Sequence, residues 1–273
     1  MIAVWASPGI ARQAAVAVGS LTAHAVTTTK AADALAVVGG AAWCSDATAA
    51  LQAGARAVLA VHPEGGTAAD LHAVRAVADG RRVWVERRLR PARLAAQVRE
   101  LLAAPRSALL PPSLIEIDVA AAGADLADAL ADAISWVGVV VHDPVVRLEG
   151  SAATRYGAIA RLTALTGVGD AAASTTVVVT ATAVRAGAGV LRATLLAPAR
   201  VEVEIDLDAR TQAVTVTDEQ GAMTLAPSFD DPLRHALRRA IERLDSAEPT
   251  HDLDALVDDR AAATGIFRPT DYA

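Results

Sequence analysis

The sequence is poor in several kinds of residue, and each shortage excludes a class of function. A single cysteine, Cys44, excludes an intrachain disulfide and any metal site built from several thiolates. Aromatic residues make up 3% of the chain, which argues against nucleic-acid binding through stacked rings. Lys30 is the only lysine, so chemistry that needs an amine has one residue available. No uninterrupted apolar run reaches the roughly 18 residues of a membrane span.

What remains is the composition of a globular protein. The chain has 273 residues, which suits one large domain or two modest ones, and 53% of them are hydrophobic, enough for a core of Ala, Val and Leu. The net charge of −6 offers no basic field for a phosphate backbone. Residues 1–18 are apolar without a preceding cationic segment, so they predict a strand, turn and helix rather than a signal peptide. We therefore expect a cytoplasmic protein with no nucleic-acid or membrane partner.

The first hundred residues alternate between expected strands and helices. Because the strands are apolar throughout and separated by helices, the pattern predicts a parallel sheet covered on both faces. The expected strands cover residues 2–6, 34–38, 57–61 and 82–85, with a further short strand at 23–27. The expected helices cover residues 10–18, 46–53, 67–77 and 91–102, with Asp46 and Thr67 near the helix starts as caps.

The pattern changes after three prolines, Pro105, Pro111 and Pro112, which indicate a hinge. Later strands follow one another without helices, and residues 201–208 alternate between apolar and acidic side chains, which gives one buried face and one open acidic face. Expected strands cover residues 114–119, 175–184, 190–196, 201–207 and 213–217; expected helices cover residues 126–136, 156–165 and a segment from Pro232 onward, capped by Asp231.

These patterns together predict the fold class. Residues 1–105 are expected to form an α/β domain with a Rossmann-like parallel sheet, truncated relative to a full dinucleotide-binding domain. Residues 106–273 are expected to form an α+β domain with a mostly antiparallel, open-faced sheet.

Three segments resemble the Gfo/Idh/MocA family of oxidoreductases, which includes glucose-fructose oxidoreductase and inositol dehydrogenase. Residues 33–63 read DALAVVGGAAWCSDATAALQAGARAVLAVHP and resemble the family's strand, helix and strand that run into Glu-Lys-Pro. Residues 67–91 resemble the next helix and strand, ending in Arg87-Arg88-Leu89-Arg90-Pro91. Residues 229–266 resemble the family's closing pair of helices. The resemblance implies NAD(P) bound on the first domain and hydride transfer to or from a sugar or polyol.

The cofactor-binding residues that the resemblance implies are only partly present. Ala6, Pro8 and Ala11 stand at the positions of the glycine-rich turn, and Gly9 is its one glycine. Ser7, Gly9 and Ile10, at the start of a helix, are the candidate cofactor-binding residues, forming a weak anion site or a plain strand-to-helix turn. No acid follows the short second strand to bind a ribose. NAD(P) binding is therefore expected to be weak or lost.

The catalytic residues implied by the resemblance are also replaced. His62 stands in place of the lysine, as a candidate proton donor or as a solvated histidine at a strand end. Gly157 and Ala160 fall where an Asp and a His are expected, and neither transfers a proton. His142-Asp143 is an alternative pair, although adjacent strand residues point to opposite faces. Arg87 and Arg88 are candidates for holding a substrate or another anion, or belong to a solvated basic face. No metal-binding spacing is present.

Three functions stay open, and enzymatic activity is uncertain. The leading hypothesis is a degenerate member of this family, a pseudoenzyme that acts as a non-catalytic subunit or regulatory partner. It would form a homo- or hetero-oligomer through the sheet of its second domain, the face that serves as the usual oligomer surface in relatives. The alternative is an NAD(P)-dependent oxidoreductase with a rebuilt site, in which His62 donates the proton and Arg87 or Arg88 holds an anion. A small-ligand or anion-binding protein is the third.

Overall fold

The computed structural model describes residues 1–103, 112–141, 144–166, 173–187, 189–197, 199–226, 231–246 and 250–267. Its contacts divide the chain into two units. Unit 1 comprises Met1–Arg93 and Phe229–Asp258; unit 2 comprises Leu94–Ser228 and Asp259–Ala273. The sequence predicts a single boundary at residue 105, which assigns residues 229–258 to the second domain. In the structure this segment instead packs with the first sheet, because its apolar side chains join the core of that sheet.

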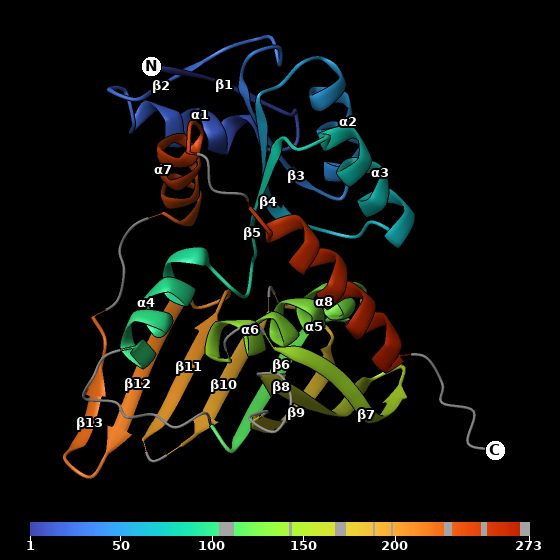
Figure 1. Cartoon of the computed structure of the whole chain (residues 1–273), viewed down its shortest axis with the longest axis vertical. Helices are drawn as coiled ribbons and strands as arrows, with labels where there is room; N and C mark the ends of the chain where they lie inside the picture. Colours follow the sequence, from blue (N-terminus) through green and yellow to red (C-terminus); the bar gives the residue numbers. More distant parts are fainter. Residues whose placement is uncertain are drawn as a thin grey trace. The chain divides into compact units, whose positions relative to one another are not determined.

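Unit 1 contains the predicted parallel sheet, here called sheet A (Figure 1). Within the described residues its strands are ordered β2-β1-β3-β4-β5, and each neighbouring pair is parallel. Strand β2 lies on one side of β1, and β3, β4 and β5 lie on the other. The position between β1 and β3 is therefore a topological switch point, where ligands bind in sheets of this kind. The strands are β1 (Ile2–Ala6), β2 (Ala25–Thr27), β3 (Leu35–Gly40), β4 (Ala57–Pro63) and β5 (Arg82–Glu86).

Helices cover both faces of sheet A, with α1 and α7 against one face and α2 and α3 against the other (Figure 1). Thr67 caps α3 in a reciprocal capping box with Asp70, and Asp231 caps α7, with Pro232 in its first turn, as predicted. The prediction for α2 was wrong at its start: the helix begins at Trp43, and Asp46 lies in its first turn, where its charge suits the helix dipole. These helices are α1 (Ala11–Gly19), α2 (Trp43–Gln52), α3 (Ala68–Ala78) and α7 (Pro232–Arg243).

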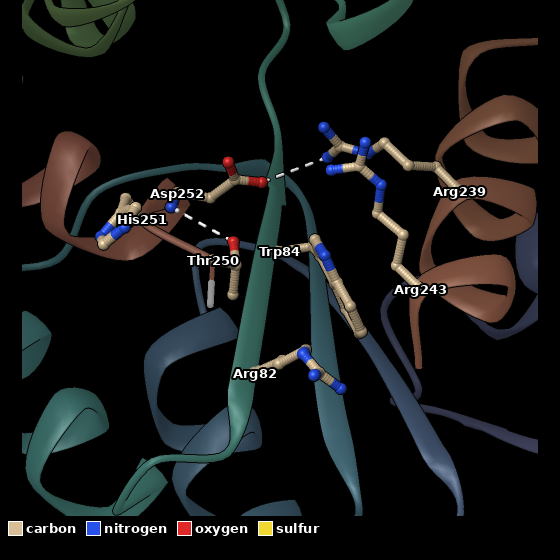
Figure 2. A pocket seen from close by; sticks show the side chains of 7 residues that line it. All are labelled: Arg82, Trp84, Arg239, Arg243, Thr250, His251 and Asp252. Carbon is tan, nitrogen blue, oxygen red and sulfur yellow. Dashed lines mark hydrogen bonds and ion pairs between the residues drawn. The ribbon is translucent and has the colours of Figure 1, made fainter. Parts of the chain in front are cut away.

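The outer edge of sheet A is covered from the far end of the sequence. Strand β5 is the edge strand, and the carboxylate of Asp252, at the start of α8 (Asp252–Phe267), accepts a hydrogen bond from the Val85 N–H at 3.1 Å. The same carboxylate accepts a hydrogen bond from Arg239 of α7 at 3.2 Å (Figure 2). An edge N–H that would otherwise invite another strand is thereby satisfied.

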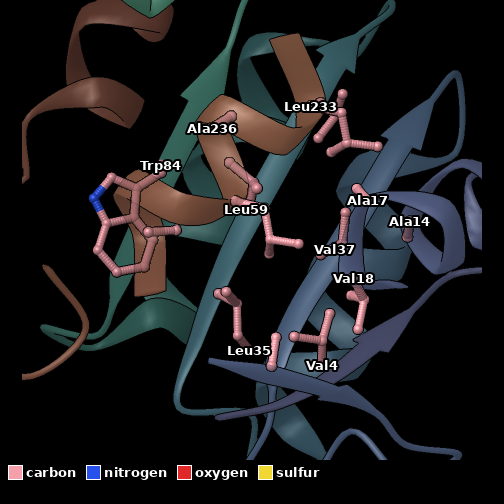
Figure 3. Close-up of a cluster of buried hydrophobic side chains, with 14 of the residues drawn as sticks. Val4, Ala14, Ala17, Val18, Leu35, Val37, Leu59, Trp84, Leu233 and Ala236 are labelled. Carbon is pink, nitrogen blue, oxygen red and sulfur yellow. The ribbon is translucent and has the colours of Figure 1, made fainter. Parts of the chain in front are cut away.

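The core of unit 1 lies in two layers, one on each face of sheet A. Figure 3 shows the layer on the α1 and α7 side, where Val37 and Leu59 of the sheet meet Leu233 of α7. The opposite layer contains Trp43, Leu71 and the Ala and Val side chains that alternate with those of the first layer. Small aliphatic side chains on both faces explain why these strands read as continuous apolar runs.

Unit 2 contains a second sheet, here called sheet B. Within the described residues its strands are ordered β13-β12-β11-β10-β6-β9-β8-β7, antiparallel except for the β6/β9 pair. This confirms the predicted fold class of a parallel α/β sheet followed by a mostly antiparallel one. The strands are β6 (Leu114–Ala122), β7 (Val145–Thr154), β8 (Gly157–Thr166), β9 (Ala173–Val184), β10 (Val190–Leu196), β11 (Arg200–Asp206), β12 (Thr211–Asp218) and β13 (Gly221–Thr224).

One predicted helix of unit 2 is wrong. Residues 156–165 were expected to be helical, but Gly157–Thr166 is strand β8, paired with β7 and β9. Ala158, Ala160 and Leu162 are buried while Ile159 and Arg161 are exposed, which is the period of a strand. The helices of unit 2 are α5 (Leu126–Ser135) and the short α6 (Val137–Val140), preceded by a 3₁₀ turn at Gly123–Asp125; α4 (Ala92–Ala103) and α8 each cross the division between units.

The acidic face predicted for sheet B is present on β11, and arginines accompany it. Val201, Val203 and Ile205 are buried, and the carboxylates point the other way. Glu204 lies 2.9 Å from the guanidinium of Arg192, and Glu202 lies 2.8 Å from that of Arg200. No helix in the described residues is long and apolar enough to cross a membrane.

The close approach of β3 to the paired strand β4 predicts that Gly39 does not tolerate a larger residue. A Cβ added at Gly39 would lie 2.7 Å from the Val61 carbonyl oxygen and 3.0 Å from Ile10 Cδ1, closer than packed atoms approach. Gly39→Ala is therefore expected to lower the free energy of unfolding by about 2 kcal/mol or more, measured by urea denaturation. Gly19→Ala is the control, because a Cβ there meets nothing within 4 Å. Equal stability of the two variants would contradict the prediction.

Candidate functional site

The turn between β1 and α1 lies at the switch point of sheet A. The Ser7 N–H donates to the Val37 carbonyl at 2.9 Å, and the Ile10 N–H donates to the Ser7 carbonyl at 3.1 Å. Pro8 has no N–H. The Gly9 backbone is outside the left-handed region, and a Cβ there would lie at an ordinary 3.7 Å from the Gly39 carbonyl oxygen. This turn closes on itself and offers fewer free donors than a glycine-rich phosphate loop.

Two features of this turn still suit an anion. Ile10 is the N-cap of α1 and makes no side-chain capping bond, so the positive end of the helix dipole is uncompensated. The Ser7 hydroxyl is buried and has no hydrogen-bond partner among the described residues. The structure thus brings the predicted Ser7, Gly9 and Ile10 together, with the Ser7 and Ile10 N–H groups engaged within the protein. The turn therefore offers the pyrophosphate of a nicotinamide nucleotide only some of the hydrogen-bond donors of a glycine-rich loop.

The end of β2 is where a ribose would be held. Thr28 follows the strand, its N–H donates to Val4, and its hydroxyl accepts a hydrogen bond from the Lys30 N–H at 3.3 Å. Residues 28–34 then lead directly into β3 with no helix or strand, in a stretch that the structure describes completely. The one acid of this connection, Asp33, lies next to the start of β3 and not at the end of β2, and its backbone N–H donates to the Gly54 carbonyl. The region for the adenosine half is therefore small.

His62 lies near the end of β4, directly after Val61, which is paired with Gly39 of β3. Its backbone is in the left-handed region, with φ of 46°, which is uncommon for a non-glycine residue. Burial and, to a smaller extent, the nearby charge of Arg88 lower the pKa of His62 from 6.5 to about 4. The charge of Asp231 acts in the opposite direction and raises this pKa. The imidazole is therefore neutral at pH 7. It can accept or donate a hydrogen bond, but it does not carry the cationic proton of a lysine.

The two predicted arginines occupy different environments. Arg88 is one-third exposed, and its guanidinium lies 3.9 Å from the Glu64 carboxylate, near His62. Arg87 is buried, with only 1% of its surface exposed. Both residues follow β5 directly, but one side chain is buried and the other is partly exposed, so the two guanidinium groups do not form one anion-binding surface. Of the pair, Arg88 is the one placed beside His62.

Glu86, the last residue of β5, is a titratable group that the sequence reasoning missed. It is 1% exposed; its Oε1 accepts a hydrogen bond from the Ala92 N–H at 3.0 Å, and its Oε2 has no partner among the described residues. Burial raises the pKa of this carboxyl to about 7, although Arg239 and the Ala92 bond act in the opposite direction. The signal in the sequence that could have found Glu86 is a carboxylate directly after the apolar run Val83–Val85.

The Asp and His expected in the second domain have no counterpart at the predicted positions. Gly157 and Ala160 lie on strand β8, and His142-Asp143 lies outside the described residues. Helix α5 carries two carboxylates one turn apart, Asp128 and Asp132, and Asp128 is 2.9 Å from Arg260. The described residues contain no group of three His, Cys, Asp or Glu side chains able to hold a metal ion.

Comparisons with solved structures identify other proteins that have this fold. The UDP-N-acetylglucosamine 3-dehydrogenase GnnA from Acidithiobacillus ferrooxidans superposes with a TM-score of 0.67 at 15% identity, over 97% of this chain and 96% of that one. KijD10, a 3-ketoreductase from Actinomadura kijaniata solved with NADP and TDP-benzene, superposes with a TM-score of 0.67 at 14% identity over the same shares.

This chain has the fold of these oxidoreductases. An oxidoreductase from Pseudomonas syringae gives a TM-score of 0.63 at 16% identity, over 84% of this chain and 74% of that one. No family model matches the sequence, and no curated protein matches it. The two-domain fold that the resemblance in the sequence implied is confirmed.

The opposite pKa changes of His62 and Glu86 predict opposite pH dependences. His62 has a lower pKa folded than unfolded, so its contribution to stability is complete above pH 6.5 and is lost as the pH falls toward 4. We expect wild-type protein to lose roughly 2–3 kcal/mol through this group across that window. His62→Asn, which tolerates the left-handed backbone, should remove the loss, as measured by urea denaturation at pH 4 to 7.

Glu86 provides the complementary control. Its folded pKa is raised above the unfolded value of 4.5, so its contribution is complete below pH 4.5 and is lost as the pH rises through 7. Glu86→Gln, which keeps the acceptor for the Ala92 N–H, should therefore become more stable relative to wild type as the pH rises from 4.5. An unchanged pH slope in either variant would count against the corresponding assignment.

Proposed function

We propose that this chain is a degenerate homologue of the Gfo/Idh/MocA oxidoreductases that acts as a non-catalytic subunit or regulatory partner, with weakened NAD(P) binding. The observation that carries the proposal is His62. At the strand end where the resemblance implies a lysine, the chain has an imidazole whose pKa is lowered to about 4 by burial and by Arg88. A group that is neutral at pH 7 is a poor replacement for an ammonium as proton donor.

Two further observations support this proposal. The β1–α1 turn uses the N–H groups of Ser7 and Ile10 for its own closure, which leaves less for a pyrophosphate. The helical Asp and His that the resemblance implies are not supplied by residues 157 and 160, which are Gly and Ala on a strand. The packing of sheet A, by contrast, is complete, with strands β3 and β4 fully buried in their central residues. The scaffold is retained where the chemistry is not.

The partner surface in this proposal is the open face of sheet B. The face carries Glu202 and Glu204 beside Arg200 and Arg192, so it presents both signs of charge instead of one acidic field. Such a face suits a second copy of the chain or a related subunit with a similar pattern, because paired charges need partners that complement them in register. The association would bring this chain to a catalytic relative without any chemistry of its own.

A true oxidoreductase with a rebuilt site is the second candidate, and the full-length likeness to a dehydrogenase and a ketoreductase favours it. In that case a bound nicotinamide nucleotide supplies or accepts the hydride. His62 would hold the proton of the substrate hydroxyl at an imidazole nitrogen, and Arg88 beside it would orient an anionic group. The lowered pKa of His62 would then set the lower limit of the active pH range.

Turnover separates the two candidates. Purified protein is incubated with NADH or NADPH and keto sugars, and with NAD⁺ or NADP⁺ and sugars, polyols or nucleotide sugars, and absorbance at 340 nm is followed. We expect rates below about 0.01 per second, against the 1 per second or more of ordinary enzymes. Ordinary turnover that His62→Ala abolishes would establish the second candidate, and turnover that survives His62→Ala would remove both.

The end of β2 predicts the preference of any nucleotide binding that remains. An acid at this position favours NAD by binding the ribose 2′-hydroxyl, whereas a nearby cation accommodates the 2′-phosphate of NADP. Here Thr28 and Lys30 stand at the strand end. NADP⁺ is expected to bind about tenfold more tightly than NAD⁺ by calorimetry. Lys30→Met should weaken NADP⁺ alone, with NAD⁺ as the internal control; tighter binding of NAD⁺ would contradict this assignment.

A further inference from the structure

A cavity of about 230 Å³ lies along the outer edge of sheet A, away from the turn where a nucleotide would bind. It is formed by β5, α7 and the residues that lead into α8 (Figure 2). The volume is below the roughly 300–1,000 Å³ of sites for drug-sized ligands, so it suits a small molecule. Its lining residues are Arg82, Trp84, Arg239, Arg243, Thr250, His251 and Asp252.

The lining is dominated by cationic side chains. Three arginines face one carboxylate, that of Asp252, which is 3.2 Å from Arg239. Arg239 and Arg243 are four residues apart on α7 and therefore share one side of the helix. Glu86 is not in the lining but interacts electrostatically with Arg239; since its pKa is raised to about 7, it carries only part of a negative charge at neutral pH. The cavity keeps an excess of positive charge.

Two of the three arginines, Arg239 and Arg243, have hydrogen-bond donors that the described residues do not use. Arg82 donates to the Leu244 carbonyl, and Arg239 donates to Asp252. The Nε of Arg239 is buried and has no hydrogen-bond partner among the described residues, and Arg243 has neither a hydrogen bond nor an ion pair with any of them. Buried guanidinium donors normally find an acceptor, so this arrangement indicates one that comes from outside the chain.

We propose that this cavity binds a compact ligand with a phosphate group, either inorganic phosphate or a small phosphomonoester. A tetrahedral dianion offers acceptor oxygens to several guanidinium groups at once, which a single carboxylate does not. Thr250 and His251 add donors at the N-terminus of α8, where the helix dipole favours negative charge. Trp84 forms an apolar wall and reports on occupancy. This site is independent of the proposed function and of the nucleotide-binding turn.

Calorimetric titration with inorganic phosphate, at constant ionic strength set by chloride, tests the proposal. We expect saturable binding to one site, accompanied by a change in tryptophan fluorescence that Trp84→Phe removes without removing the binding. Arg243→Gln should weaken phosphate binding about tenfold, the effect of losing one charge-assisted hydrogen bond. The exposed position of Arg243 makes this variant suitable, because its removal leaves the Arg239–Asp252 pair intact.

The matched control is Arg12→Gln, which removes an exposed arginine from the first turn of α1, beside the nucleotide-binding turn. Unchanged phosphate affinity in this control, with the loss in Arg243→Gln, supports the proposal. Equal weakening in both variants, or phosphate that acts no differently from chloride, overturns it. Malonate that binds as tightly as phosphate overturns the assignment to phosphate. Glycerol 3-phosphate binding more tightly than inorganic phosphate identifies a phosphomonoester as the ligand.

Discussion

Burial of sheet A on both faces is the constraint on which the rest of unit 1 depends. The central residues of β3 and β4 have no exposed surface, and their side chains are almost all Ala, Val or Leu. Such small side chains fill two layers only if helices lie close on each face, and two of these helices, α7 and the start of α8, come from the far end of the sequence. Closing the core therefore requires residues separated by nearly the whole chain. Ser7, Glu86 and Arg87, which are buried polar residues of unit 1, lie at or just after strand ends.

Strand ends next to so complete a core place ionisable groups in a poorly hydrated environment. His62 and Glu86 follow the buried parts of neighbouring strands, and desolvation is the largest influence on both. Desolvation disfavours the charged form, so it lowers the pKa of the histidine and raises that of the glutamate. One physical cause thus leaves His62 neutral and Glu86 only partly ionised near pH 7. Uncharged side chains cost less to bury at this edge than charged ones.

The predictability of the fold follows from the range of the interactions involved. Strands β1 and β4 and the cap of α3 were predictable because apolar runs and the Thr67–Asp70 pair are local patterns. Strand β8 was mistaken for a helix because its alanines and leucines favour helices, and its burial alternation depends on pairing with β7 and β9. The packing of residues 229–258 in unit 1 could not be predicted from the sequence either, because it depends on the surface of sheet A that α7 covers.

The candidate sites divide in the same way. The turn at Ser7–Ile10 and the histidine near the end of β4 were candidates because they stand where the family resemblance implies a glycine-rich turn and a lysine. The sequence did not indicate that Arg87 is buried and Arg88 more exposed, because this depends on how the chain turns after β5. The edge cavity joins Arg82 to Arg239 and Arg243, more than 150 positions later in the sequence. No spacing rule connects such residues.

Residues within the layers of sheet A and residues at the strand ends contribute differently to stability. The residues that hold sheet A together point into its two layers, whereas Ser7 follows β1, His62 is the next-to-last residue of β4, and both contribute little apolar burial. Changes at the strand ends therefore alter chemistry at small cost in stability, and changes within the layers do the reverse. Gly39 is the exception that links the two, since it lies at the strand end and also sets the distance between β3 and β4. Ser7 and His62 can therefore vary at small cost to the fold, whereas Gly39 cannot.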